Sequence, residues 1–167
     1  MNIEQIKTDI NQWIEEFLEI PNPALGGWSP CPYARRARLD NAYEVRLGNN
    51  ILFDIINVAT QGLGGRDVVI IAYDPADYTG TNFELAVHAA CKQYLLPRDL
   101  IALVDHPDLP ELVNGVTMNQ GAYALILIQN LTDLNQKAAA MGRKGFYDTW
   151  PDAYLKELFQ HRKDPRP

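Results

Sequence analysis

The stretches DVVIIAY (residues 67–73) and DLIALVD (residues 99–105) decide the fold of this chain. Each is a continuous apolar run bounded by polar residues, which is typical of a strand buried on both faces of a sheet. Residues 81–95 between them carry apolar side chains at helical spacing, and Thr81 with Glu84 predicts a capping box at the helix start. The order strand, helix, strand therefore predicts a right-handed crossover between parallel strands.

The flanking sequence extends this pattern over the rest of the chain. Residues 42–47 alternate like a strand with one solvated face, and residues 122–129 form a further apolar run. We expect an α/β protein, with α+β as the alternative, built as a single domain over residues 1–167 around one mixed sheet of about four strands. Helices are expected at residues 2–20, from Ile51 to about Gly62, at residues 131–141 and at residues 151–161.

Composition and charge limit the function classes. Of the 167 residues, 47% are hydrophobic and 22% are charged, which are ordinary values for a globular protein. The formal net charge of -6 argues against general binding to a phosphate backbone. No apolar run approaches the ~18–20 residues of a membrane span, and no signal peptide is visible, so we expect a cytoplasmic protein without a membrane partner. Residues 161–167 are expected to be a frayed tail.

The segment PNPALGGWSPCPYARRARLDN, residues 21–41, differs from the rest in its proline, glycine and arginine content. A loop this long inside a compact domain is usually functional, so we expect it to form part of a site. Proline suits the first position of a helix, and a short helical turn is therefore expected from Pro32 to about Arg38.

Cys31 is the leading candidate nucleophile. It stands at the expected start of this turn, and a helix N-terminus with arginines nearby favours thiolate over thiol. We therefore expect a lowered pKa for the Cys31 thiol. The alternative is a buried structural cysteine in a loop braced by prolines, and Cys91 is assigned to the core on its helical position.

Arg35, Arg36 and Arg38 place three guanidinium groups within four residues of an acidic chain. Their geometry suits the oxygens of a carboxylate or phosphate, so a small anionic molecule is the expected ligand. Trp28 and Tyr33 are expected to contact this ligand. The alternatives are an internal cluster of salt bridges for the arginines and simple packing for the aromatic residues.

Asp74, Asp105 and His106 leave the carboxyl ends of the two buried strands. Those ends are expected at one edge of the sheet, where open α/β sheets bind ligands. His106 would be the general base for Cys31, and Asp74 would orient it. Alternatively, Asp74, Asp105 and His106 would hold a metal ion with mixed oxygen and nitrogen ligands.

The order of landmarks resembles an uncharacterised bacterial domain-of-unknown-function family that carries a Cys-Pro-Phe-Ala motif. The resemblance covers about residues 5–107 and includes Trp13, the motif CPYA at residues 31–34 with its basic turn, and the strand end at His106. Asp74 departs from the family, which has a histidine at that strand end. The resemblance implies a site at these positions and implies no activity.

Three functions are consistent with this sequence. The first is a small enzyme with a Cys31, His106 and Asp74 site acting on a small anionic substrate. The second is a non-catalytic module that binds an acidic metabolite or a protein partner, and the third is a metal-binding protein. The sequence leaves open the reaction, the cofactor and whether the chain forms a homo-oligomer.

Overall fold

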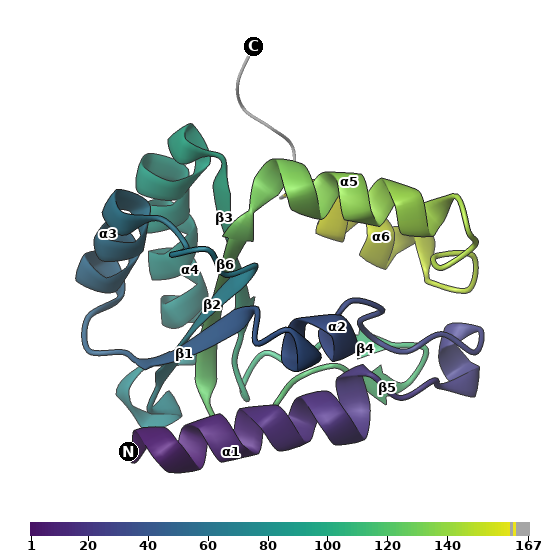
Figure 1. Ribbon diagram of the computed structural model, residues 1–167, viewed down its shortest axis with the longest axis horizontal. Helices are drawn as coiled ribbons and strands as arrows, with labels where there is room; N and C mark the ends of the chain where they lie inside the picture. The colour runs from purple at the N-terminus through teal and green to yellow at the C-terminus, as the bar shows by residue number, and fades with distance from the viewer. Residues whose placement is uncertain (161, 163–167) are drawn as a thin grey trace.

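The computed structural model describes residues 1–160 and 162, and its centre is a mixed four-stranded sheet (Figure 1). The strand order is β1-β2-β6-β3, with β1 parallel to β2 and β6 antiparallel to both β2 and β3. The expected α/β fold is therefore confirmed. The strands β2 and β3 run in the same direction as expected, but β6 lies between them. The bounds are β1 Tyr43–Leu47, β2 Val68–Tyr73, β3 Leu100–Asp105 and β6 Ala124–Asn130.

Helices α3 (Ile51–Gln61) and α4 (Gly80–Ala90) cover one face of the sheet (Figure 1). Asn50 caps α3 as expected, because its side chain accepts a hydrogen bond from the Phe53 amide. The capping box predicted at Thr81 and Glu84 is wrong, since Thr79 caps α4 and Gly80 is already helical. A Cβ at residue 80 would lie 2.8 Å from the Leu109 side chain, so this first turn needs a glycine to pack closely.

Helix α1 (Ile3–Trp13) lies across the other face and continues as a π-helical turn, Ile14–Leu18. Its buried side chains Ile6, Ile10 and Ile14 recur every four residues and pack on the strands β1, β2 and β6. The short helix α2 (Ala34–Leu39) follows the loop on the same side of the sheet (Figure 1). The helical turn expected in this loop is thus present.

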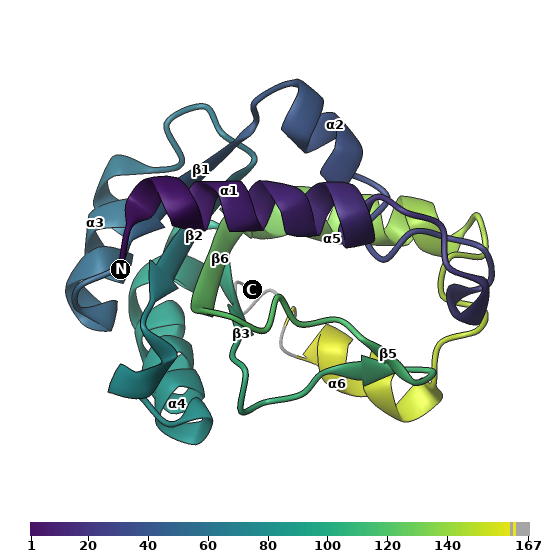
Figure 2. The ribbon, with the colours of Figure 1, turned by 90° about the horizontal axis from the view of Figure 1, so that it is seen from below.

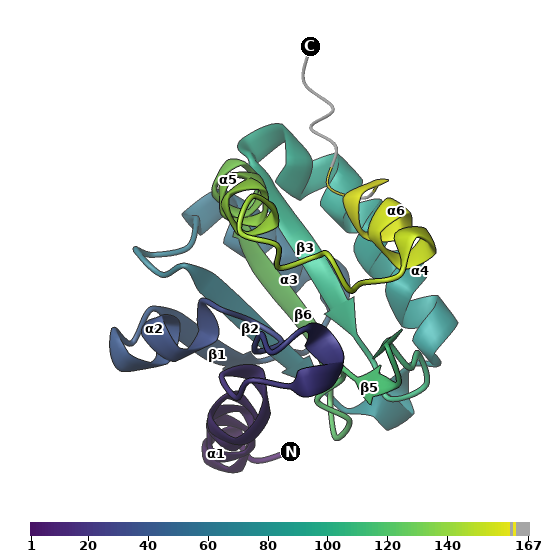
Figure 3. The ribbon, with the colours of Figure 1, turned by 90° about the vertical axis from the view of Figure 1, so that its right-hand side faces the viewer.

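The remaining elements form a third group, which has an apolar core of its own. Helices α5 (Leu131–Gly142) and α6 (Asp152–Gln160) belong to this group, and Figure 3 shows strand β3 between them. A small hairpin, β4 (Leu112–Val113) with β5 (Val116–Thr117), lies near α6 in Figure 2. These elements share a separate apolar core with the 3-10 helix Pro23–Leu25; its buried members are Leu25, Val113, Met141, Phe146 and Trp150.

No helix within residues 1–160 and 162 is long and apolar enough to cross a membrane. The tail predicted at residues 161–167 lies outside the described residues except for Arg162.

Candidate functional site

Cys31 lies in the loop before α2 and packs at the margin of the core between α1 and the sheet. Its amide donates a hydrogen bond to the Leu18 carbonyl, at the end of the π-helical turn (3.0 Å). Burial raises the pKa of the Cys31 thiol, and this effect outweighs the backbone amides and the cations Lys137 and Arg162 that lower it. The expected lowering of the Cys31 pKa is therefore wrong, because partial burial disfavours the charged thiolate more than the nearby donors and cations favour it.

His106 lies on the opposite side of the sheet from Cys31. Its ring is fully buried and packs against Phe83 of α4, with 5.5 Å between the ring centroids. The Asp108 amide donates to Nδ1 at 3.1 Å, so Nε2 carries the proton that is donated to the Tyr78 carbonyl at 3.1 Å. Both ring nitrogens are occupied, and the structure does not bring Cys31 and His106 together as nucleophile and base.

Asp74 and Asp105 have local structural partners. Asp74 caps the 3-10 helix Pro75–Asp77, where its carboxylate accepts a hydrogen bond from the Ala76 amide. Asp105 is buried and accepts hydrogen bonds from the Asn119 side-chain amide at 3.0 Å and the Gln120 backbone amide at 2.8 Å. Over residues 1–160 and 162 no group of three or more His, Cys, Asp or Glu side chains could hold a metal ion. The metal site expected from Asp74, Asp105 and His106 is therefore not formed.

Two of the three loop arginines are held in salt bridges. Arg38 contacts Glu15 and Glu19, each at 2.8 Å, and these contacts tie α2 to the end of the first helix. Arg36 contacts Asp40 one helical turn later at 3.2 Å. The hydrogen bond from Arg38 holds the pKa of the Glu19 carboxyl below its usual value, and the exposed Arg35 adds a smaller electrostatic effect. This geometry favours the salt-bridge interpretation for Arg36 and Arg38.

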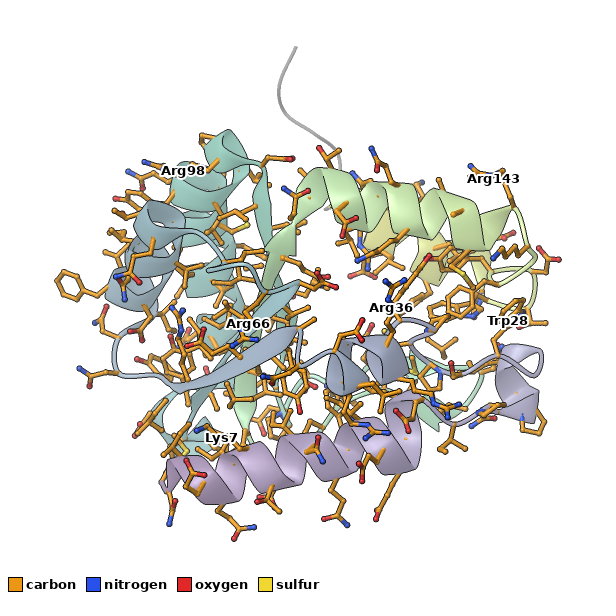
Figure 4. All side chains as sticks on the ribbon, viewed as in Figure 1. Lys7, Trp28, Arg36, Arg66, Arg98 and Arg143 are labelled. Carbon is orange, nitrogen blue, oxygen red and sulfur yellow. The ribbon has the colours of Figure 1, made fainter. Side chains whose placement is uncertain are left out.

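Trp28 and Tyr33 join an aromatic cluster on the side of α5. The Trp28 ring meets Phe146 edge to face at 5.9 Å, and the Lys137 ammonium lies 5.3 Å from the centre of the Tyr33 ring. Figure 4 places Trp28 at the end of the molecule, beside the 3-10 helix of this loop. The loop is thus packed against α5 and the turn that follows it.

The hairpin of β4 and β5 is a feature that our reading of the sequence missed. Its turn is Asn114-Gly115, with φ values of 51° and 80°, and the side-chain amide of Asn114 donates to the carbonyls of Ala24 (2.9 Å) and Thr149 (2.7 Å). Asn114 therefore links the loop before α2 to the segment before α6. An Asn-Gly pair between two short runs of strand-forming residues is a strong hairpin signal, and the sequence contains it at Leu112–Thr117.

A cavity of about 490 Å³ lies between α5 and the side chains of Tyr147, Phe159 and Arg162. The Nε atom of Arg162 is shielded from solvent and has no hydrogen-bond partner among residues 1–160 and 162. The Asn135 side chain donates to the Arg162 carbonyl at 3.0 Å and fixes this residue beside α5. The cavity is lined by Asn135, Ala138, Ala139, Gly142, Tyr147, Phe159 and Arg162.

The cavity has a mixed electrostatic environment. Burial lowers the pKa of the Arg162 guanidinium and raises that of the Tyr147 hydroxyl, and each of these groups also interacts with the Cys31 thiol. Glu111 interacts with Arg162 as well, and its carboxylate accepts a hydrogen bond from the Tyr154 hydroxyl. Burial and the charge of Asp105 raise the pKa of Glu111. The Arg162 guanidinium thus interacts electrostatically with both the Glu111 carboxyl group and the Cys31 thiol.

Comparisons with known proteins add no relative. No family model matches the chain, and the comparisons with curated proteins and with solved structures give no match. The resemblance to a family with a Cys-Pro-Phe-Ala motif stays a prediction, and the function has to be argued from the geometry alone.

Proposed function

We propose that this protein binds a small organic anion in the cavity between α5 and α6, with Arg162 as the group that holds the negative charge. The observation that carries the proposal is the Arg162 Nε, a shielded donor without a partner among residues 1–160 and 162, in a residue that lines the cavity. A buried donor without an acceptor costs about 1–3 kcal/mol, and an oxygen of a bound anion would remove this cost.

The residue types of the cavity support the same proposal. Arginine matches the two oxygens of a carboxylate or phosphate, and its guanidinium keeps its charge when buried. The remaining lining side chains are mostly small or aromatic, and a volume of about 490 Å³ falls within the usual range of small-molecule sites. Because carboxylates already hold Arg36 and Arg38, we assign the expected anion to Arg162 rather than to the loop arginines.

Ligand-induced thermal stabilisation tests the proposal. We expect benzoate or phenyl phosphate, added at 100-fold excess over its Kd, to stabilise the protein by about 2.7 kcal/mol, and Arg162→Gln to abolish the effect. Arg143→Gln is the matched control, because it removes the same charge from an exposed position at the end of α5 (Figure 4). If neither anion stabilises the protein, or if both variants respond like the wild type, the proposed function is wrong.

A second candidate is an enzyme in which Cys31 reacts with a group on the bound anion. It is favoured by the electrostatic interaction of the Cys31 thiol with Tyr147 and Arg162, both of which line the cavity. Since His106 lies on the other side of the sheet, this candidate does not use it as the base.

Alkylation of Cys31 in a Cys91→Ser background tests this second candidate. A thiol beside Arg162 should react with anionic iodoacetate faster, relative to neutral iodoacetamide, than free glutathione does. Arg162→Gln should return the ratio of the two rates to the glutathione value. A wild-type ratio equal to that of glutathione would separate Cys31 from the anion site.

A further inference from the structure

We infer that strand β1 is the interface between two copies of this chain, which pair edge to edge and antiparallel and join their sheets into one. The two copies are related by a two-fold axis at Val45, so each contributes the same residues. The inference goes beyond the proposed function and does not depend on the anion site.

The outer edge of β1 offers free backbone groups. Figure 2 shows the strands in the order β1, β2, β6, β3 from top to bottom, so β1 has a neighbour on one side only. The Gly48 amide donates to a β2 carbonyl at 2.8 Å, and the Ala42 carbonyl accepts from a β2 amide at 3.3 Å. Backbone groups alternate in direction along a strand, so Tyr43, Val45 and Leu47 direct their N–H and C=O groups outward. In the described part of the chain no other segment bonds to these outward groups, and such an edge is a template for a further strand.

The two charges of β1 are complementary to those of a second copy. Glu44 and Arg46 lie on the α3 face of the strand, because their partners on β2, Val69 and Ile71, belong to the core under α3. Within one chain Glu44 and Arg46 pair at 2.9 Å. When Val45 of one copy lies opposite Val45 of the other, Glu44 faces Arg46 twice across the interface. These positions lie between the hydrogen-bonded pairs, where facing side chains come closest.

The same charges select this register over its neighbours. A shift by two residues sets Glu44 opposite Glu44, or Arg46 opposite Arg46, and like charges directly opposite each other destabilise a strand pair. A shift by one residue sets outward backbone groups opposite inward ones and turns the side chains to the wrong face. The pairing centred on Val45 is therefore the one that satisfies both the backbone and the charges, and it closes as a dimer.

Apolar side chains around β1 support the same partner. Leu47 is 47% exposed, and in this register it lies opposite the Tyr43 ring of the second copy, which is a favourable cross-strand pair. Leu39, Leu52 and Phe53 are also exposed, and they belong to the segments that flank β1. The two-fold axis brings the segment before β1 of one copy toward the segment after β1 of the other, so these exposed side chains gather on both sides of the paired strands.

Sedimentation equilibrium of the full chain with exchanged charges tests the inference. The wild type should show a monomer–dimer equilibrium. Glu44→Arg alone sets Arg opposite Arg, and Arg46→Glu alone sets Glu opposite Glu, so each should weaken the dimer by at least about 10-fold, or about 1.4 kcal/mol. An equimolar mixture of the two variants restores opposite charges at both positions and should dimerise like the wild type. The double variant Glu44→Arg with Arg46→Glu should also dimerise.

Recovery in the mixture separates this interface from a structural role, because each single variant lacks its internal ion pair whether or not it is mixed. Glu16→Arg and Arg143→Glu are the matched controls, since they make the same charge changes at exposed positions and should dimerise like the wild type. Circular dichroism checks that every variant is folded. A monomeric wild type, single variants that dimerise as tightly as the wild type, or a mixture that does not recover would overturn the inference and leave the proposed anion site standing.

Discussion

Replacing Asn114 with aspartate tests how firmly the hairpin of β4 and β5 holds the loop before α2 to the segment before α6. Asn114→Asp keeps the shape of the side chain and its tolerance for the left-handed backbone at φ 51°. It removes the amide group that donates to the carbonyls of Ala24 and Thr149 at 2.9 and 2.7 Å. At neutral pH the ionised carboxylate would instead place an oxygen against two carbonyl oxygens.

The expected loss follows from these two contacts. Each hydrogen bond contributes about 0.5–1.5 kcal/mol to the free energy of unfolding, so the variant should lose about 1–3 kcal/mol at pH 7. For a chain of this length that corresponds to a fall in Tm of about 2–4 °C per kcal/mol. The carbonyl oxygens should raise the folded-state pKa of the new carboxyl, so the loss is full above that pKa and shrinks as the pH falls through it, because the protonated carboxyl donates one hydrogen bond.

Urea unfolding followed by tryptophan fluorescence measures this effect, since Trp28 and Trp150 both belong to the aromatic core beside the hairpin. Asn114→Gly is the control, because glycine adopts the positive φ freely and lacks the side chain, so its loss should not depend on pH. A loss below about 0.5 kcal/mol for Asn114→Asp at pH 7, less than one hydrogen bond, would show that Asn114 does not hold the two segments together.

Three further predictions concern ionisable groups. In a Cys91→Ser background, alkylation of Cys31 should have its midpoint above the ordinary pKa of a thiol, and a midpoint below that value would show an activated thiolate. Because the folded-state pKa of Glu111 is raised, its ionisation destabilises the fold as pH rises through the unfolded pKa. The change in Tm from wild type to Glu111→Gln should therefore be more positive at pH 7 than at pH 4. An equal change in Tm at both pH values would contradict this. The Tyr123 hydroxyl lowers the Asp9 pKa through a 2.6 Å hydrogen bond, so Tyr123→Phe should raise the Asp9 pKa measured by NMR. The variant should also lose the stability that this bond contributes above the unfolded pKa of Asp9 and that disappears as pH falls through the folded pKa. An unchanged Asp9 titration would show that the bond is absent in solution.

The strands could be predicted from the sequence because their signal is local. Residues 67–73 and 99–105 are apolar runs of strand length, and β2 and β3 lie within one residue of these bounds. The insertion of β6 between them could not be predicted in the same way. A run of buried residues has the same composition whether its neighbour is parallel or antiparallel, so the pairing depends on contacts between distant segments.

The relation of Cys31 to His106 depends on which face each residue occupies. Side chains alternate along a strand, so the consecutive residues Asp105 and His106 turn to opposite faces. Asp105 pairs in register with Leu125, whose side chain belongs to the core under α1, whereas His106 packs on α4. The loop with Cys31 crosses the α1 face, and the sequence of that loop contains nothing that selects a face. The expected site of Cys31, His106 and Asp74 was therefore predicted wrongly at the choice of sheet face, although each residue follows the element expected for it.

The four-residue spacing of the last expected helix, residues 151–161, continues in the sequence to Arg162. Tyr154, Leu158 and Arg162 are spaced four residues apart, and the first two are partly buried against the aromatic core. The Arg162 amide donates a hydrogen bond to the Phe159 carbonyl at 3.2 Å, and the Arg162 guanidinium lies 5.9 Å from the centre of the Phe159 ring. A cationic residue that follows an apolar stripe is either solvated in a tail or attached to the fold. Here the hydrogen bond from the Asn135 side chain on α5 to the Arg162 carbonyl attaches Arg162 to the fold. The position of Arg162 is therefore set by a contact with α5, which the sequence around Arg162 alone does not encode.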